Sequence, residues 1–133
     1  MKFELLNYLD IISSVSSLLK EDEVGFEDIL NTLIKCYQNR GIVYTIGCGG
    51  SSSTASHFTA DLSKTVGGFK SICLSDNTPL VSAITNDLGW ENVFEYQLKN
   101  WMGGNDVLVV FSVHGGSKDW SYNLIKAMKL AKK

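Results

Sequence analysis

The chain has 133 residues, of which 44% are hydrophobic and 20% charged, and its formal net charge is −2. This length suits one ordinary domain with one core, and this composition excludes a disordered or fibrous protein. The small net charge gives no basic field that would recruit nucleic acid or an anionic membrane.

The first two predicted elements are amphipathic helices. Apolar residues recur every three to four positions over residues 3–19 and again over residues 26–37, and "NRG" at 39–41 is a stop signal for the second helix. Serines gather on the first helix, which indicates either close contact between the helices of two subunits or a solvated face. Neither helix carries obvious chemistry.

The pattern changes after Gly41 to short, continuous apolar runs, which are typical of strands covered on both faces. Strands are predicted at 42–46, 71–74 and 106–113. Helices are predicted at 52–65, 79–85, 90–100 and 118–131. Thr78 is the expected N-cap of the helix over 79–85, because Pro79 suits a first helical position.

Strands that alternate with helices predict parallel βαβ units with right-handed crossovers. The expected fold is therefore a three-layer α/β domain with a doubly wound parallel sheet. We expect the whole chain, 1–133, to be this single domain, with N-terminal helices to about residue 40 and the parallel core over 41–133.

The three cysteines, Cys36, Cys48 and Cys73, show no CxxC pair and no metal-like spacing. An odd number suits a reducing compartment better than a disulfide framework. The N-terminal stretch carries Glu4 and Asp10 inside its apolar pattern, unlike a signal peptide, and no later run approaches eighteen apolar residues. The sequence therefore predicts a cytoplasmic protein that does not span a membrane.

Two loops of small residues each follow a predicted strand and precede a predicted helix: "IGCGGSSS" at 46–53 and "FSVHGGSKD" at 111–119. In a parallel sheet such loops lie at the carboxyl ends of strands, where ligands bind. Glycines let a ligand approach the backbone, and helix N-termini attract anions. One such loop is often only a turn, but two in one short fold favour a small phosphorylated ligand.

A nucleotide-binding domain is the weaker interpretation of these loops. The first loop lacks the third glycine of the dinucleotide fingerprint, and no acidic residue stands at the end of a second strand. The P-loop pattern GxxxxGK[ST] is absent as well.

Three segments resemble the sugar isomerase (SIS) domains of the phosphoheptose isomerase group. "GCGGSSSTASHFTADLSK" resembles "GNGGSA…HFA(A/E)(D/E)L", "NDLGWENVF" resembles "NDFGYExVF", and "VLVVFSVHGGSKDWSYNLIKAMKLAKK" resembles "VLLxISTSGNSxNVxxAxxxAK". The similarity runs from about Ile29 to Lys133. It implies a flavodoxin-like parallel sheet, a homotetramer with sugar phosphate bound at subunit interfaces, and conversion of sedoheptulose 7-phosphate to heptose 7-phosphate, towards lipopolysaccharide precursors.

The resemblance also implies roles for individual residues. Asp61 matches the catalytic glutamate, and His57 matches a histidine that helps to hold zinc in some members. Asp87 falls in the "ND" motif beside the sugar. The expected substrate loops contribute Gly50, Ser51 and Ser52 in the first, and Ser112, His114 and Ser117 in the second.

Moving a carbonyl between C1 and C2 of a sugar phosphate needs a base and an acid, and passes through an enediol. His57 and Asp61 are four residues apart, so they share one helix face, and Asp61 is the expected base. The same pair could hold a metal, although two ligands alone do not make a zinc site. A structural His–Asp pair on the surface is the alternative.

This sequence departs from the family pattern at four places. Asp61 replaces a longer glutamate, Cys48 replaces the asparagine of "GNGG", and "SVHGGS" replaces "STSGNS". The chain also ends at Lys133, before the strand pair and the C-terminal helix that carry a glutamine and a histidine in the family. The main alternative to an isomerase is therefore a non-catalytic SIS module that binds a phosphosugar or acts as a scaffold.

Overall fold

The computed structural model describes residues 2–132. The chain forms two compact units, one up to Thr32 and one from Leu33 onward. The boundary between them falls inside the second helix. No helix within residues 2–132 is both long enough and apolar enough to cross a lipid bilayer.

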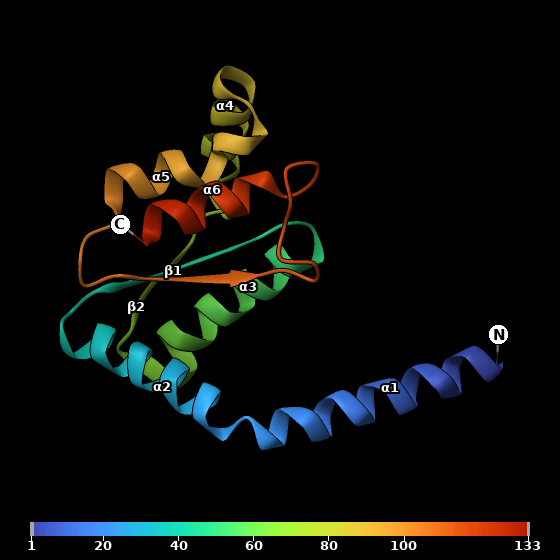
Figure 1. Cartoon of the computed structure of the whole chain (residues 1–133). Helices are drawn as coiled ribbons and strands as arrows, with labels where there is room; N and C mark the ends of the chain where they lie inside the picture. Colours follow the sequence, from blue (N-terminus) through green and yellow to red (C-terminus); the bar gives the residue numbers. More distant parts are fainter. Residues whose placement is uncertain (1, 133) are drawn as a thin grey trace. The chain divides into compact units, whose positions relative to one another are not determined.

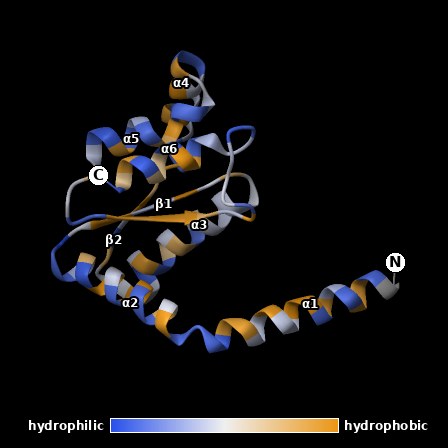
Figure 2. Ribbon diagram, in the orientation of Figure 1, coloured by the Kyte–Doolittle hydropathy of each residue, from blue (hydrophilic) through white to orange (hydrophobic). Residues whose placement is uncertain are grey.

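The first unit contains α1 (Lys2–Glu21) and the beginning of α2 (Glu23–Gln38). Helix α2 begins earlier than the apolar pattern predicts because Asp22 caps it: the Asp22 carboxylate accepts a hydrogen bond from the Gly25 N–H at 3.1 Å. Hydrophobic residues recur along the ribbon of α1 in Figure 2, and their side chains stay exposed. They include Leu5, Leu6, Leu9, Ile12, Val15 and Leu18.

The second unit is built on a three-stranded parallel sheet in the order β2-β1-β3. Its strands are β1 (Ile42–Gly47), β2 (Lys70–Cys73) and β3 (Val107–Phe111). Strand β1 is central, and its continuous apolar run is buried because helices cover both faces. The predicted parallel α/β sheet is therefore confirmed.

The sheet lies between two layers of helices (Figure 1). One layer contains the end of α2, from Leu33, and α3 (Gly50–Ala60), which continues as a π-helix, η1 (Asp61–Gly67). The other contains α4 (Thr78–Leu88), a 3-10 turn η2 (Trp90–Asn92), α5 (Val93–Trp101) and α6 (Tyr122–Ala131).

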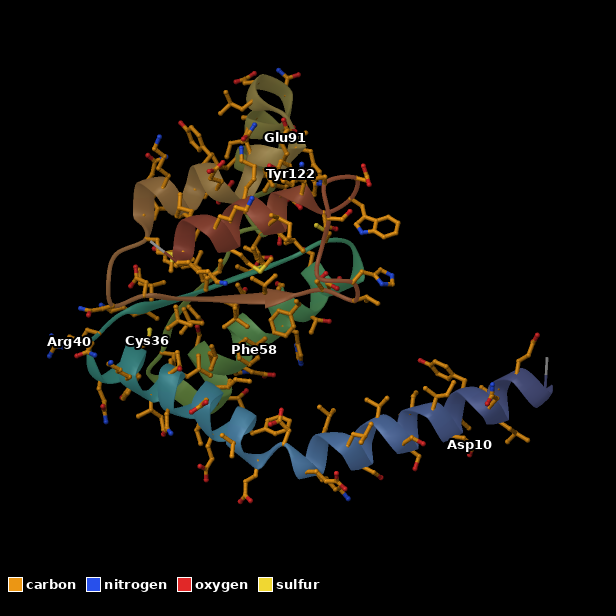
Figure 3. The ribbon with its side chains drawn as sticks, viewed as in Figure 1. Asp10, Cys36, Arg40, Phe58, Glu91 and Tyr122 are labelled. Atoms are coloured by element: carbon orange, nitrogen blue, oxygen red, sulfur yellow. The ribbon has the colours of Figure 1, made fainter. Side chains whose placement is uncertain are left out.

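Alternate side chains of β1 enter the two cores. Tyr44 and Ile46 pack with Phe94 and other residues of the α4–α6 layer, whereas Val43 packs with Leu62 and Cys36 on the α3 side. Figure 3 shows Cys36 and Phe58 on this second side of the sheet. The period of two along β1 thus separates the two cores.

The Asp106 carboxylate binds backbone N–H groups at the end of the sheet where β1 begins. Its carboxylate accepts hydrogen bonds from the N–H groups of Ile42 and Gly103, each at 2.7 Å. Burial, and secondarily the negative charge of Asp106, raises the pKa of the Cys36 thiol and of the Tyr44 phenol. Both groups are therefore held in their neutral form to a higher pH than usual.

The N-termini of α4 and α6 also differ from the prediction. Asn77, not Thr78, caps α4: its side-chain oxygen accepts the Leu80 N–H at 3.2 Å, and Thr78 is the first helical residue. The last helix begins at Tyr122 rather than near 118. Ser117 draws the preceding segment into a turn by accepting from backbone N–H groups, and Ser121 adopts a left-handed conformation with φ of 51°.

Candidate functional site

The two small-residue loops meet at the carboxyl edge of the sheet. Strands β1 and β3 are neighbours in parallel register, and Gly47 lies opposite Phe111, so both loops leave the sheet side by side. A pocket of about 180 Å³ lies between them. Its lining includes Cys48 and Ser51 from the first loop and Ser112 and His114 from the second.

Glycines shape the first loop. A Cβ atom on Gly47 would lie 2.4 Å from the carbonyl oxygen of Ser51, so no larger residue fits where the chain turns into α3. Gly49 has φ of 56° and ψ of −125°, a conformation that is essentially restricted to glycine. The turn is then continued by backbone hydrogen bonds from Ser51 and Ser52 to Cys48 and Gly49. The small residues therefore allow a strand to turn directly into a helix.

A buried polar contact joins the first loop to α6. Asn123 is 0% exposed, and its amide nitrogen lies 3.5 Å from the Cys48 sulfur. Its side-chain oxygen accepts the Leu124 N–H at 2.9 Å. The cysteine that replaces an asparagine in the family motif thus contacts an asparagine from another element. Sequence reasoning missed Asn123, although a lone amide within the apolar face of α6 is a usable signal.

Serine hydroxyls organise the second loop, which spans residues 112–121. Ser112 Oγ accepts the Gly115 N–H at 3.0 Å. Ser117 Oγ accepts the N–H groups of Asp119 and Trp120 at 3.1 and 3.3 Å. Each hydroxyl uses its lone pairs in these bonds, so its hydrogen is still available for an anion. The loop is preformed, and the hydroxyl donors expected from the sequence are present in it.

A second pocket, of about 530 Å³, opens beside the N-terminal half of α3. Its lining includes His57, Ser52, Ser56 and Asp76. Ser56 Oγ donates to an Asp76 carboxylate oxygen at 3.0 Å, and Ser52 Oγ donates to Ser75 Oγ at 2.7 Å. Asp76, from the loop after β2, was missed, and the expectation that no acidic residue stands at the end of a second strand was wrong. Its position after a predicted parallel strand was the available signal.

The structure places His57 and Asp61 on one helix face, as their spacing predicts. The distance from His57 Nε2 to Asp61 Oδ2 is 3.5 Å, and the two side chains are 81% and 47% exposed. Asp61 also accepts a hydrogen bond from Thr65 Oγ1 at 3.1 Å. Asp61 begins the π-helix, an element that often occurs at functional sites. His57 lines the larger pocket, whereas Asp61 lies just outside its lining.

His57 and Asp61 do not by themselves fit a zinc ion. Zinc in proteins takes three or four protein ligands. Within residues 2–132, no group of three or more His, Cys, Asp or Glu side chains is close enough together to hold a metal. The pair offers two ligands, and no chemical step is assigned to a metal here.

The structure does not bring Asp87 to the two loops. Asp87 lies near the end of α4, and its carboxylate accepts a hydrogen bond from the Asn86 side chain at 2.8 Å. Asp87 is not among the residues that line either pocket, and it lies nine positions after the first residue of α4. At 1.5 Å per residue, that is about 14 Å along the helix.

Comparison with known proteins shows three similarities. A family model described as "SIS domain" matches residues 7–133. A phosphoheptose isomerase of Helicobacter pylori (strain ATCC 700392 / 26695) is 36% identical over 136 residues, which cover 99% of this chain and 67% of the relative. A lincomycin biosynthesis protein of Streptomyces lincolnensis is 46% identical over 99 residues, or 69% of this chain and 36% of that protein.

A solved structure is also similar. The phosphoheptose isomerase from Neisseria gonorrhoeae superposes with a TM-score of 0.82 at 27% identity, covering 98% of this chain and 68% of that one. The chain thus spans about two thirds of this solved chain, and between about one third and two thirds of the curated relatives described above. The parallel order β2-β1-β3, the paired loops and the family match over residues 7–133 agree, and the chain belongs to the SIS domain family.

Proposed function

We propose that this protein is a sugar-phosphate isomerase of the phosphoheptose isomerase type, which converts sedoheptulose 7-phosphate to heptose 7-phosphate. The observation that carries the proposal is the convergence of two Gly/Ser loops on one pocket at the carboxyl edge of a parallel sheet. The relatives named phosphoheptose isomerase support the choice of substrate.

The second loop is the proposed phosphate site. Ser112, His114 and Ser117 carry side-chain donors, and the loop leads into the N-terminus of α6. Charge-assisted hydrogen bonds from hydroxyl, imidazole and backbone N–H groups suit a phosphate ester. Gly50, Ser51 and Ser52 face the same edge from the first loop and are proposed to contact the sugar.

The proton transfer is assigned to the helix that follows the first loop. Asp61 is the proposed base that removes a proton from C1 or C2, giving an enediol. His57, at 3.5 Å, is the neighbouring group that can donate or accept the returning proton. Asp87 is proposed to contact the sugar only from another subunit, because within one chain it lies far along α4.

The proposed assembly is a homotetramer in the cytoplasm. Exposed apolar side chains on α1 leave a face that a second copy of this chain could cover. The three cysteines are free thiols, which suits a reducing compartment. The proposed pathway role is the supply of heptose for lipopolysaccharide precursors.

The test is incubation of the purified protein with sedoheptulose 7-phosphate, with the appearance of heptose 7-phosphate followed by NMR. Turnover that depends on protein concentration is the expected result. Binding of the sugar phosphate with no conversion would contradict the isomerase proposal.

One observation favours a second candidate, a non-catalytic module that binds a phosphosugar. The Asp61 carboxylate is occupied by Thr65 and lies outside the pocket that His57 lines. In that case Asp61 would stabilise the junction of α3 and the π-helix and would transfer no proton. The NMR experiment distinguishes the two candidates, since only the first predicts conversion.

A further inference from the structure

The most exposed aromatic ring near the two loops belongs to Trp120. Its indole is 62% exposed, yet it stacks on the imidazole of His114 with ring centroids 5.8 Å apart and planes inclined by 30°. Both rings border the 180 Å³ pocket between the loops. Core packing does not account for an indole in this position, because so much of the ring remains in water.

Hydrogen bonds to Ser117 and the conformation of Ser121 constrain the backbone before and after Trp120. The Ser117 N–H donates to the Trp120 carbonyl at 2.8 Å, and Ser117 Oγ accepts the Trp120 N–H at 3.3 Å. Ser121 follows in a left-handed conformation that non-glycine residues rarely adopt. A Cβ atom on Gly116 would lie 2.9 Å from the Ser121 carbonyl oxygen, so the loop also needs a glycine there. These constraints hold the backbone from which the indole projects.

His114 itself is exposed, and it lines the pocket together with Ser51 and Ser112. A free imidazole on an exposed loop would sample several rotamers and lose that freedom on binding. Stacking on the Trp120 indole lowers this cost, because one orientation of the imidazole is favoured before the ligand arrives.

We propose that Trp120 is a positioning residue: its indole orients the His114 imidazole at the mouth of the pocket and thereby sets the affinity for phosphate esters. The proposal rests on the proposed function, which places the phosphate at this loop. It adds Trp120 to the residues that determine phosphate affinity at this loop, besides the serines and glycines of the Gly/Ser pattern.

The test is a double-mutant cycle measured by calorimetry, with sedoheptulose 7-phosphate and inorganic phosphate as separate probes. We expect His114→Ala to weaken binding about tenfold, since a charge-assisted hydrogen bond is lost. Trp120→Ala should weaken it about three- to fivefold. The double variant should bind within about twofold of His114→Ala alone, because Trp120 acts through His114.

Two variants control for structural damage. Trp120→Phe keeps a flat ring and should return affinity to within about twofold of the wild type. Trp101→Ala removes another half-exposed indole, on α5, and should leave both affinities unchanged. Melting temperatures of all variants are compared with that of the wild type, so a loss of folding is separated from a loss of binding.

Additive effects in the cycle would overturn the proposal, because Trp120 would then contact the ligand independently of His114. No rescue by Trp120→Phe, or no effect of Trp120→Ala, would overturn it as well. Binding without isomerisation would refute the proposed reaction and leave this inference standing. A wild-type protein that binds neither probe would refute both.

Discussion

The loops after β1 and β3 leave neighbouring strands at the same edge, yet they are built differently. The first turns into α3 within a few residues, through Gly47 and Gly49, and its geometry comes from the backbone. The second takes ten residues to reach Tyr122, labelled in Figure 3, and its geometry comes from serine hydroxyls and a ring stack. Two loops at the same edge of a sheet can thus be shaped by backbone constraint or by side-chain contacts.

The difference suggests that the two loops have different roles, one in turnover and the other in affinity. The first loop leads into the helix that carries His57 and Asp61, so changes on its side should alter turnover. The second loop presents hydroxyl and imidazole donors, so changes there should alter affinity. The following experiments test whether the two loops differ in this way.

The largest effect is expected from Asp61→Asn. The substitution keeps size and hydrogen bonding but removes the basic oxygen, so kcat should fall by about 10²–10⁴-fold while the Kd for sedoheptulose 7-phosphate changes little. Turnover and calorimetric binding are measured on one preparation.

Thr65→Val is the matched control, because it removes the hydroxyl that donates to Asp61 and keeps the carboxylate. Its kcat should stay within about tenfold of the wild type. A melting temperature lowered by Asp61→Asn, with turnover per folded molecule intact, would assign Asp61 a purely structural role.

The next largest effect is on stability and concerns Gly47→Ala. The new Cβ would lie 2.4 Å from backbone, which cannot move aside as a side chain can, so the free energy of unfolding should fall by about 3 kcal/mol. Chemical denaturation measures this change.

Gly50→Ala is the comparison in the same loop. A Cβ there meets nothing within 4 Å, and alanine favours the first turn of α3, so stability should rise by about 0.5–1 kcal/mol. Equal effects of the two substitutions would show that the close approach at Gly47 does not shape the loop.

The contrast between the loops also explains what the sequence could predict. The strand at 42–46, the glycine turn and the shared face of His57 and Asp61 follow from local spacing, and the structure agrees. The start of α6 could not be predicted from local spacing. The Ser117 hydroxyl binds backbone N–H groups of residues that would otherwise continue the helix, and the helix propensity of residues 118–121 does not reflect this contact.

Contacts between segments that are distant in the sequence could not be predicted either. Asn123 reaches Cys48 across 75 residues, and no periodicity encodes such a pair. The π-helix that begins at Asp61 and the cap at Asn77 depend on local hydrogen bonds. At the cap, the neighbouring Thr78 was an equally plausible choice from sequence. For Asp87, the motif names the residue, but Asp87 lines neither of the two pockets.

A smaller effect, on affinity, is expected from the double change Ser112→Ala and Ser117→Ala. Losing two hydroxyl donors to a charged group should weaken sugar-phosphate binding by about 1–3 kcal/mol in total. kcat at saturating substrate should change little, since no proton-transfer group is touched. Ser82→Ala, an exposed hydroxyl on α4, is the control. An unchanged calorimetric affinity in the double variant would show that the phosphate group does not bind at this loop.

The smallest effect concerns thiol reactivity. Cys36 is 3% exposed, and burial raises the pKa of its thiol, so at pH 8 less of the reactive thiolate forms than in an ordinary cysteine. Cys48 is half-buried and borders the pocket. A disulfide reagent should therefore modify Cys48 about tenfold faster than Cys36, and Cys48→Ser should remove the fast phase. Raising the pH towards the elevated pKa should increase the Cys36 rate; a fast phase that survives Cys48→Ser would contradict this order.

The most direct test of the central claim, that both loops hold one phosphosugar, is an NMR titration of the ¹⁵N-labelled protein with sedoheptulose 7-phosphate. The account predicts that amide shifts concentrate in residues 49–53 and 112–117, with inorganic phosphate reproducing only the second set. Shifts confined to one loop at saturation with the sugar phosphate, or shifts elsewhere on the chain with neither loop affected, would contradict it.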